Sequence, residues 1–483
     1  MDWFGAPEYQ LGRLVLERGI AAVYLIAFLA AARQFRALLG ERGMLPIPRY
    51  LATRTFRQAP SIFHWHYSDR FFAAIAWGGA VLATALVAGA STLVPLWATM
   101  AAWLALWVGY LSIVNVGQQW YSFGWESLLC EAGFLAIFLG NDRVAPPVLV
   151  LWLTRWLLFR VEFGAGLIKL RGDRCWRDLT CLDYHHETQP MPGPASWFFH
   201  HLPAPLHRVE AAGNHLTQLV VPFGLFAPQP VAGIAAAIMI VTQLWLVASG
   251  NFAWLNWLTI VLAGGVLVAP GAATPATAAG PAPVWFVAAV VAVTVVVAVL
   301  SVWPVVNMVS AGQRMNASFN PLRLVNTYGA FGSVGRTRYE VVVEGTAHDA
   351  LTDDAVWHEY EFRGKPGAPG RLPRQWAPYH LRLDWLMWFA ALSPSYARGW
   401  FEPFLLRLLV NDPATVRLLR HNPFALAAPR FVRAQLYRYR FTTAAELRRD
   451  RTWWHRTLIG PYVAPVTLRG EGRSDRFPYS APD

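Results

Sequence analysis

The chain has 483 residues, of which 55% are hydrophobic and only 14% are charged, and its formal net charge at pH 7 is +12. This balance is typical of a chain that lies largely in a lipid bilayer, and it argues against an ordinary soluble enzyme, which carries more charge. The basic residues are spread over loops and the C-terminal part without a nucleic-acid-binding motif, so we expect no nucleic acid as partner.

Several apolar stretches of the N-terminal part reach the roughly 18 to 20 residues that are needed to cross a bilayer. Because the first stretch lacks a preceding basic segment and a small-residue cleavage site, we expect it to be a retained anchor. We therefore expect an α-helical polytopic membrane protein with about seven to nine spans. The full-length windows are 15–35, 71–90, 93–114, 145–168, 231–249, 252–270 and 283–303, and the shorter candidates are 127–140 and 214–228.

The character of the chain changes near residue 304. Before it, apolar stretches are interrupted by hydrophilic loops at about 36–70 and about 170–213, and by a Pro/Ala/Gly connector at 269–283. After it, apolar and polar residues alternate. We therefore expect a multi-span transmembrane domain over residues 1–303 and an extramembrane α+β domain over residues 304–483.

The C-terminal part contains strand and helix patterns. RYEVVVEG (338–345) and WHEYEF (357–362) are predicted to form a hairpin, and aromatic residues alternate with arginines in a third strand within 429–443. Helices are predicted at 382–392 and 401–420, the latter with an N-cap at Asp412. The expected fold is a soluble α+β domain with a small antiparallel sheet.

Charged residues lie within the predicted spans. In a helix over 145–169, Arg155, Glu162 and Lys169 are seven residues apart, so they lie within about 40° of one another. An ionised group that faces lipid costs several kcal/mol, so this stripe is expected to face the bundle interior, a water-filled cavity or, for Lys169, the membrane interface. Arg160 points elsewhere and needs another partner. The predicted intramembrane polar cluster is Glu126, Glu131, Arg155, Arg160, Glu162 and Lys169.

Lys169 is one of only two lysines in the sequence, and the residues leave two interpretations open. In the first, it belongs to a buried ion-pair network that fixes how the helices pack. In the second, it lines an intramembrane site, where a desolvated lysine acts as a base or binds an anionic group.

The loop after Lys169 is dense in Trp, His, Asp and Cys. No spacing in it is diagnostic of a metal, so we predict no metal site, and the aromatic residues suit a position at the lipid headgroups. Cys175 and Cys181 are candidates for a disulfide if the loop faces an oxidising compartment. The other candidate site residues of this loop are Asp173, Trp176, Asp178, Asp183, His185 and His186.

Several long motifs resemble the lipase maturation factor family. They include QWYSFGWESLLCEAGFLAIFL, RWLLFRVEFGAGLIKLRGDRCWRDLTCLDYHH, GNFAWLNWLTIVL and NPLRLVNTYGAFGSVGRTRYEVVVEGT, and together they extend over nearly the whole chain. The resemblance implies a membrane-embedded factor that assists the folding and assembly of secreted client proteins such as lipases, without an established enzymatic activity or a cofactor.

The resemblance also implies where the protein resides. Eukaryotic relatives lie in the endoplasmic reticulum membrane, whereas abundant arginine and short loops suggest a bacterial member, for which the plasma membrane is expected. The C-terminal domain is expected on the lumenal or external side. For loop 36–70, six arginines against two acidic residues favour the cytoplasm by the positive-inside rule, and its side stays open.

AGLIKLRGDRCWRD (165–178) is also similar to a short motif in the membrane part of the vitamin-K-dependent carboxylase superfamily. That resemblance implies a base role for Lys169 and a quinol, lipid or polypeptide substrate, with quinone or lipid as a candidate ligand. An intramembrane enzyme is therefore the alternative to the assembly factor, and a transporter ranks last because no inverted repeat is evident. The sequence leaves the oligomeric state and the client open.

Overall fold

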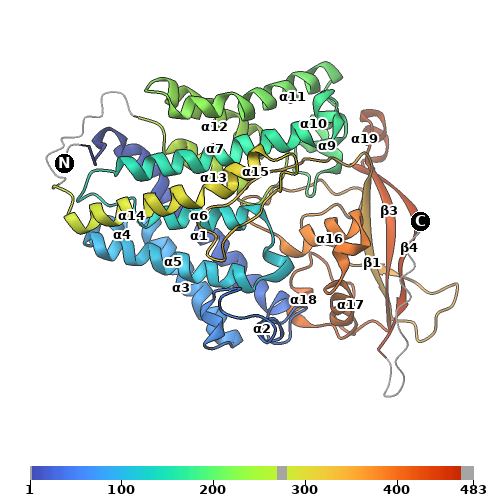
Figure 1. Ribbon diagram of the computed structural model, residues 1–483. Coiled ribbons are helices and arrows are strands. Elements are labelled where there is room, and N and C mark those ends of the chain that lie inside the picture. The colour runs from blue at the N-terminus through green and yellow to red at the C-terminus, as the bar shows by residue number, and fades with distance from the viewer. Residues whose placement is uncertain (1–2, 269–279, 469–483) are drawn as a thin grey trace.

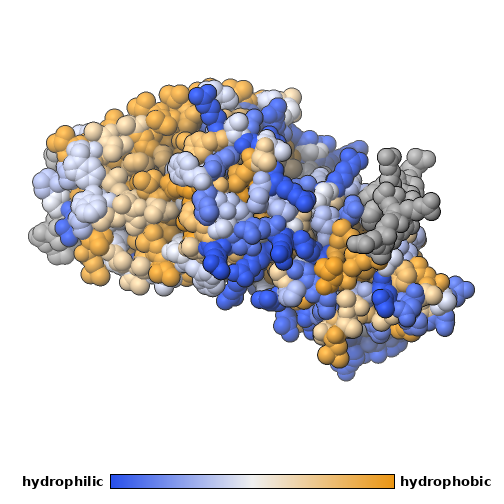
Figure 2. All heavy atoms as spheres, turned by 90° about the horizontal axis from the view of Figure 1, so that it is seen from below, coloured by the Kyte–Doolittle hydropathy of each residue, from blue (hydrophilic) through white to orange (hydrophobic). Residues whose placement is uncertain are grey.

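The computed structural model describes residues 3–268 and 280–468. A bundle of long helices forms one end of the molecule, and a small sheet with short helices forms the other end (Figure 1). Apolar residues cover most of the visible surface of the bundle end, and hydrophilic residues gather toward the sheet end (Figure 2). This division confirms the predicted fold class, an apolar helical region followed by a region with a small antiparallel sheet.

Among the described residues, five helices are long and apolar enough to cross a membrane. The first, which includes α1 (Gln10–Leu38), has 56% of its most apolar window buried, as does the helix Leu96–Val116, whereas the corresponding share is 28% for the other three helices. The first helix and Leu96–Val116 therefore lie centrally, and the other three present more of their apolar side chains outward. The five helices are Pro7–Leu38, Asp69–Ala88 (α3), Leu96–Val116 (α5), Val231–Ser249 (α12) and Val284–Val309, which contains α14 (Val284–Leu300) and α15 (Val302–Val309).

The other expected spans are also helical, but they are shorter or more polar. Window 145–168 corresponds to α7 (Val148–Arg171), which carries the charged stripe. Windows 127–140, 214–228 and 252–270 correspond to α6 (Gly124–Ala136), α11 (Ala204–Leu219) with the 3-10 helix η4 (Val221–Phe226), and α13 (Leu255–Gly264). The count of seven to nine spans stays a prediction. Most of the 269–283 connector lies outside the described residues.

Short helices connect these elements. They are η1 (Pro7–Tyr9), α2 (Ile47–Leu51), η2 (Ile62–His64), α4 (Ala90–Leu93), η3 (Gln118–Tyr121), α8 (Arg174–Arg177), α9 (Leu182–Thr188), α10 (Ser196–His200) and η5 (Pro394–Ala397). Three of them, α8 to α10, occupy the predicted loop 170–213, in which α11 also begins.

Loop 36–70 lies at the same end of the bundle as the C-terminal region. The side-chain amide of Gln34, near the end of α1, donates to the carbonyl of His380 at 2.7 Å, and Gln118 donates to the carbonyl of Leu45 at 3.0 Å. The N-terminus lies at the opposite end, where Gly5 forms a bridge with Pro147 (Figure 1). Loop 36–70 and the C-terminal region therefore share one side of the bundle.

The sheet has four antiparallel strands in the order β2-β1-β3-β4. β1 (Arg338–Thr346) and β3 (Phe431–Phe441) follow the predicted segments, and β2 (His358–Glu359) keeps only two residues of the predicted second strand. β4 (Trp454–Val466) was not predicted. In β3, Tyr439 and Phe441 are buried and Arg438 is exposed, as the alternation indicated.

Helices pack beside this sheet (Figure 1). α16 (Arg382–Leu392) has the predicted bounds, whereas the predicted helix 401–420 is divided into α17 (Phe401–Leu409) and α18 (Pro413–Val416). The division lies at Asn411, whose φ of 49° ends a helix. Asp412 caps α18 as expected, because its carboxylate accepts from the Thr415 amide at 2.8 Å. A capping box begins α19 (Ala444–Asp450).

Candidate functional site

Arg160 and Glu131 form a buried ion pair between α7 and α6. Arg160 also donates to the carbonyl of Asn326 at 2.7 Å, and Glu131 accepts from the hydroxyl of Tyr328 at 2.7 Å. Arg160 therefore finds a partner away from the stripe, as its direction on the helix indicated. Through Asn326 and Tyr328, the pair also connects the segment before β1 to the bundle.

Glu126 is bound by the C-terminal region. Its carboxylate accepts from Arg382 of α16 at 2.6 Å and from the hydroxyl of Tyr110. Arg382 also donates to the carbonyl of Trp120 at 2.6 Å, and both charged side chains are fully buried. This contact connects the helix bundle and the sheet region through one charge pair. Because the two residues are 256 positions apart, no local pattern in the sequence indicated their contact.

His380 lies beside this pair and makes the stability of the protein depend on pH. Burial, together with the nearby guanidinium of Arg382, lowers the pKa of His380 to about 4, although the Glu126 carboxylate lies 3.4 Å from its Nδ1. Arg382 neutralises that carboxylate, so His380 stays neutral in the folded protein.

We expect acid to destabilise the protein through His380. The unfolded chain takes up a proton near pH 6.5 and the folded chain only near pH 4, so the contribution of His380 is present at pH 7 and is lost as pH falls from about 6.5 to about 4. By pH 5 this loss amounts to about 2 kcal/mol. Thermal unfolding in detergent at pH 7.5 and pH 5 checks this result, since His380→Gln should unfold with a visibly smaller pH difference than wild type. An equal pH difference in both proteins would contradict the assignment.

Arg155, at the other end of the stripe, contacts no carboxylate among the described residues. Its guanidinium donates to the hydroxyl of Tyr9 at 2.8 Å and to the carbonyl of Leu225 at 3.3 Å, and it lies over the ring of Trp152. Arg155, Glu162 and Lys169 are all buried, so the stripe faces inward. They do not form one ion-pair network, however, and Arg155 lies apart from the other two.

Side-chain amides, rather than opposite charges, surround Lys169 and Glu162. The Lys169 ammonium donates to Asn214 Oδ1 at 2.7 Å and to Gln218 Oε1 at 2.9 Å. Glu162 accepts from Gln218 Nε2 at 3.3 Å and from Gln243 Nε2 at 2.7 Å. Gln218 therefore bridges the ammonium and the carboxylate. These amides are not among the residues that charge and spacing predicted, although a polar residue in an apolar helix is itself a signal.

Lys169 and Glu162 line a cavity of about 1010 Å³. The wall is mostly apolar and aromatic, and α7, α9, α11, α12, α13 and α16 contribute to it. Of the candidate loop residues, Trp176, His185 and His186 also line this cavity. The ammonium of Lys169 lies 4.9 Å from the centre of the Trp176 ring. The structure thus brings the lysine and three loop residues together at one site.

The remaining loop candidates lie outside the cavity wall. Asp173 accepts from Arg336 at 2.9 Å, and this guanidinium holds the pKa of the Asp173 carboxyl well below its usual range. Asp178 pairs with Arg174 at 3.1 Å on the surface, and Asp183 lies 3.0 Å from the ring of His207. Asp173 and Asp183 therefore connect the loop to neighbouring segments, whereas Asp178 contacts only its own exposed turn.

The structure joins Cys175 and Cys181 in a disulfide, with their Cα atoms 4.8 Å apart. The bridge encloses α8 and packs against the side chains of Leu182, Ala211 and Val334. It lies at the same end of the bundle as the sheet.

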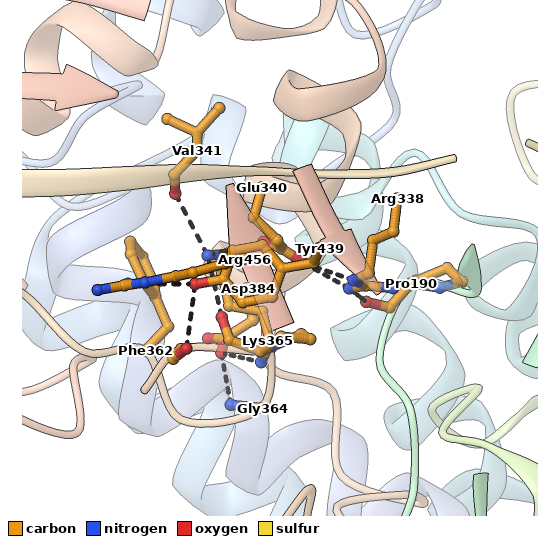
Figure 3. A network of polar contacts seen from close by, with 12 residues as sticks. Pro190, Arg338, Glu340, Val341, Phe362, Gly364, Lys365, Asp384, Tyr439 and Arg456 are labelled. Carbon is orange, nitrogen blue, oxygen red and sulfur yellow. Dashed lines mark hydrogen bonds and ion pairs between the residues drawn. The ribbon is translucent and has the colours of Figure 1, made fainter. Parts of the chain in front are cut away.

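A second buried network anchors the loop after Lys169 to the sheet (Figure 3). Arg338 of β1 donates to the carboxylate of Glu340 at 2.9 Å and to the carbonyl of Pro190 at 3.1 Å. Lys365, the second lysine of the chain, lies 2.8 Å from the other oxygen of Glu340. Asp384 accepts from the backbone amide of Lys365 at 3.1 Å. Both lysines of the protein are therefore buried, each within a polar network.

Within residues 3–268 and 280–468, no group of three or more His, Cys, Asp or Glu side chains is arranged to hold a metal ion. The paired histidines of the loop are engaged with neighbouring rings instead. His185 packs against Phe331, and His186 packs against Phe199.

Comparisons with known proteins agree over nearly the whole chain. The family model of the lipase maturation factor transmembrane domain matches residues 11–270, and that of the C-terminal domain matches residues 324–464. The chain is 42% identical to lipase maturation factor 1 of Bos taurus, over 99% of this chain and 93% of the relative. It is 42% identical to lipase maturation factor 1 of Homo sapiens, over 95% of this chain and 88% of the relative. It is 29% identical to lipase maturation factor 2 of Homo sapiens, over 95% of this chain and 83% of the relative. No solved structure matches.

These relatives come from eukaryotes, so they do not support the bacterial origin that the composition suggested. The match to the transmembrane model, together with the five apolar helices of the described residues, establishes an integral membrane protein.

Proposed function

Because the chain belongs to the lipase maturation factor family, we propose that it is a membrane-embedded factor that assists the folding and assembly of secreted lipases. The observation that carries this proposal is the 42% identity to lipase maturation factor 1 over 99% of the chain. The identity extends over both the helical bundle and the sheet region, which the Glu126–Arg382 pair connects. The proposed factor therefore acts as one unit, with the bundle in the membrane and the sheet region toward the client.

The outer strand of the sheet supports a client-binding role. β4 is the last strand in the described sheet, with β3 on one side of it. An edge strand offers backbone groups to another chain, and a partly folded protein exposes both strand edges and apolar surface. Leu458 and Ile459 of β4 are 53% and 54% exposed, so they add apolar contacts at this edge. We propose that newly made lipase docks at β4.

Cross-linking in cells tests this proposal. Newly made lipase should cross-link to the chain during a short metabolic pulse, and mature lipase should not. Ile459→Asp should lower the cross-linking several-fold, because it places a charge in the apolar contact. Leu426→Asp is the matched control, since Leu426 is fully exposed in the loop before β3 and is not part of β4. Equal cross-linking of the two variants would remove β4 as the docking surface.

We also propose that the protein resides in the endoplasmic reticulum membrane with the sheet end in the lumen. The Cys175–Cys181 disulfide supports this orientation, because disulfides form and persist in oxidising compartments. Loop 36–70 lies at the same end as the sheet, so this orientation places it in the lumen too. Its six arginines are exposed, and in this orientation they do not follow the positive-inside rule.

An introduced glycosylation site tests the orientation. Ala350→Asn creates an acceptor sequence with Leu351 and Thr352 in the exposed connection between β1 and β2. We expect a product that loses mass on treatment with endoglycosidase H, because this connection faces the lumen. Both this protein and its control, Ala350→Gln, also carry Asn316→Gln, because Asn316, Ala317 and Ser318 already form an acceptor sequence. The control then has no acceptor at either position and should not change. An unglycosylated Ala350→Asn protein that is otherwise active would place the sheet on the cytoplasmic side.

A second candidate function is an intramembrane enzyme with Lys169 as its base. The observation in its favour is the position of Lys169 on the wall of a large cavity. Two amide oxygens hold the ammonium, and Gln218 connects it to Glu162. This arrangement also suits a purely structural lysine, so the two roles need a direct test.

Replacing Lys169 with Arg separates these roles. Arginine keeps the positive charge but is a far poorer base. We expect the assembly factor to keep most of its ability to mature lipase, with any loss matched by an equal loss of thermal stability. Lipase activity in the medium and thermal unfolding of the purified variant check this expectation. Abolished maturation by a variant that unfolds like wild type would instead favour the enzyme.

A further inference from the structure

The cavity beside Lys169 has room for more than a few water molecules bound to its polar groups. Ligand pockets have volumes of about 300 to 1,000 Å³, so a cavity of about 1010 Å³ has room for a long molecule. Apolar and aromatic side chains from both the bundle and the sheet region form its wall, among them Phe252, Leu255, Trp385 and Phe389. A molecule that fills this space must therefore be largely apolar.

Polar atoms on the wall lack partners within the described residues. His186 is only 1% exposed, and neither of its ring nitrogens has a hydrogen-bond partner there, although its Nε2 lies 3.9 Å from the carboxylate of Glu210. The indole N–H of the buried Trp385 also lacks an acceptor. Lys169 has three N–H groups, and two of them donate to Asn214 and Gln218. Because a buried donor without an acceptor costs about 1–3 kcal/mol, these groups indicate a ligand with acceptor oxygens.

One exposed part of the cavity wall lies on α11 and α12, and another includes Met315, Leu392 and Tyr396. Val209 of α11 and Val241 of α12 both line the cavity, and each is 68% exposed. Between them, the indole of Trp245 donates to the carboxylate of Glu210 at 2.8 Å, which connects the two helices at this opening. Since these helices present exposed apolar residues such as Leu216, Ile238 and Leu244, the opening faces lipid.

From this geometry we infer that the cavity binds a long-chain lipid that enters from the bilayer between α11 and α12. The hydrocarbon chain lies along the apolar wall, and an oxygen-bearing head group accepts hydrogen bonds from Lys169 and His186. This site is independent of the proposed maturation of lipases, because it rests on the cavity alone. Occupancy would also fill the space between the bundle and α16.

Gly213 offers a way to close the opening without disturbing the fold. It lines the cavity from α11, and a Cβ atom added to it would meet no heavy atom within 4 Å. Gly213→Trp therefore places an indole at the opening and removes a helix-weakening glycine. Gly78 of α3 is equally open and exposed but does not line the cavity, so Gly78→Trp is the matched control.

Photo-labelling tests the inference on the full-length protein in phosphatidylcholine nanodiscs. The probe is a long-chain fatty acid with a diazirine in its chain, and a diazirine alkane of equal length, without a head group, is the comparison. We expect the fatty acid to label cavity residues of α9, α11 or α16 in wild type and in Gly78→Trp. Labelling should fall at least fivefold in Gly213→Trp, which should unfold at the same temperature as wild type.

Comparing the labelling by the two probes tests the proposed hydrogen bonds to the head group. The fatty acid should label the cavity more strongly than the alkane, and His186→Phe, which keeps an aromatic ring, should reduce this preference. Undiminished labelling of Gly213→Trp, or adducts only on the outer face of the bundle, would overturn the lipid site. Equal cavity labelling by the fatty acid and the alkane would show that Lys169 and His186 do not bind a polar head group.

Discussion

Replacing Arg382 with Met is expected to lower the free energy of unfolding by about 3–5 kcal/mol, because it leaves the Glu126 carboxylate buried without a counter-charge. The guanidinium of Arg382 donates to the carboxylate of Glu126 at 2.6 Å and also to the carbonyl of Trp120. Its guanidinium also lies 3.4 Å from the centre of the Tyr121 ring. Tyr328 makes a comparable contact, since its hydroxyl donates to the buried carboxylate of Glu131 at 2.7 Å, but Arg382 is the partner that carries the opposite charge.

Thermal unfolding and limited proteolysis together measure this effect. The variant should unfold at a clearly lower temperature, and protease should cut the segment 310–337 sooner, since the sheet region is held less firmly. Arg448→Met is the control, because Arg448 is exposed on α19 and should change neither result. Adding Glu126→Gln to the variant should restore part of the stability by removing the unpaired charge. A wild-type unfolding temperature for Arg382→Met would show that the pair does not connect the two regions.

Replacing Glu131 with Gln should destabilise the bundle by a similar amount, about 3–5 kcal/mol. The substitution keeps the shape of the side chain but leaves the Arg160 guanidinium buried without a carboxylate. Glu131 also accepts from the backbone amide of Asn326 at 3.0 Å and from Tyr328, so the segment before β1 should loosen as well. Thermal unfolding and hydrogen exchange at residues 324–329 measure the two consequences.

A double substitution separates charge from packing at this pair. Glu131→Leu with Arg160→Met replaces both charges by apolar side chains, and it should be more stable than either single substitution. Glu8→Gln, at an exposed glutamate near the N-terminus, should have no effect. If Glu131→Gln unfolds like wild type, the pair adds nothing to the stability of the bundle.

Patterns of apolar residues predicted most of the elements. Long apolar windows gave the spanning helices, and alternation gave β1 and β3, because burial on one face leaves a period of two in the sequence. β4 was missed because Gly460, Pro461 and Pro465 interrupt its pattern. Proline is tolerated on an edge strand, where the sheet does not need every amide, so β4 extends through these residues.

The candidate site was predicted only in part, since long-range contacts leave no local signal. The spacing of the stripe correctly indicated that Glu162 and Lys169 face inward. It could not show that Arg382, far along the chain, binds Glu126. It also could not show that amides such as Gln218 and Gln243 surround the charges, because neutral polar residues change the hydropathy of a helix only slightly. Charge spacing thus indicated that these charged side chains are buried, and tertiary packing selected their partners.

The most direct test of the central claim is the activity of a secreted lipase from cells that lack their own lipase maturation factors. The cells are made to express the lipase alone, with this chain, or with the Arg382→Met variant, and the activity per amount of secreted lipase is measured. We predict that the chain raises this specific activity many-fold and that the destabilised variant does so much less. Unchanged lipase activity in the presence of well-expressed, folded wild-type protein would contradict its role in lipase maturation.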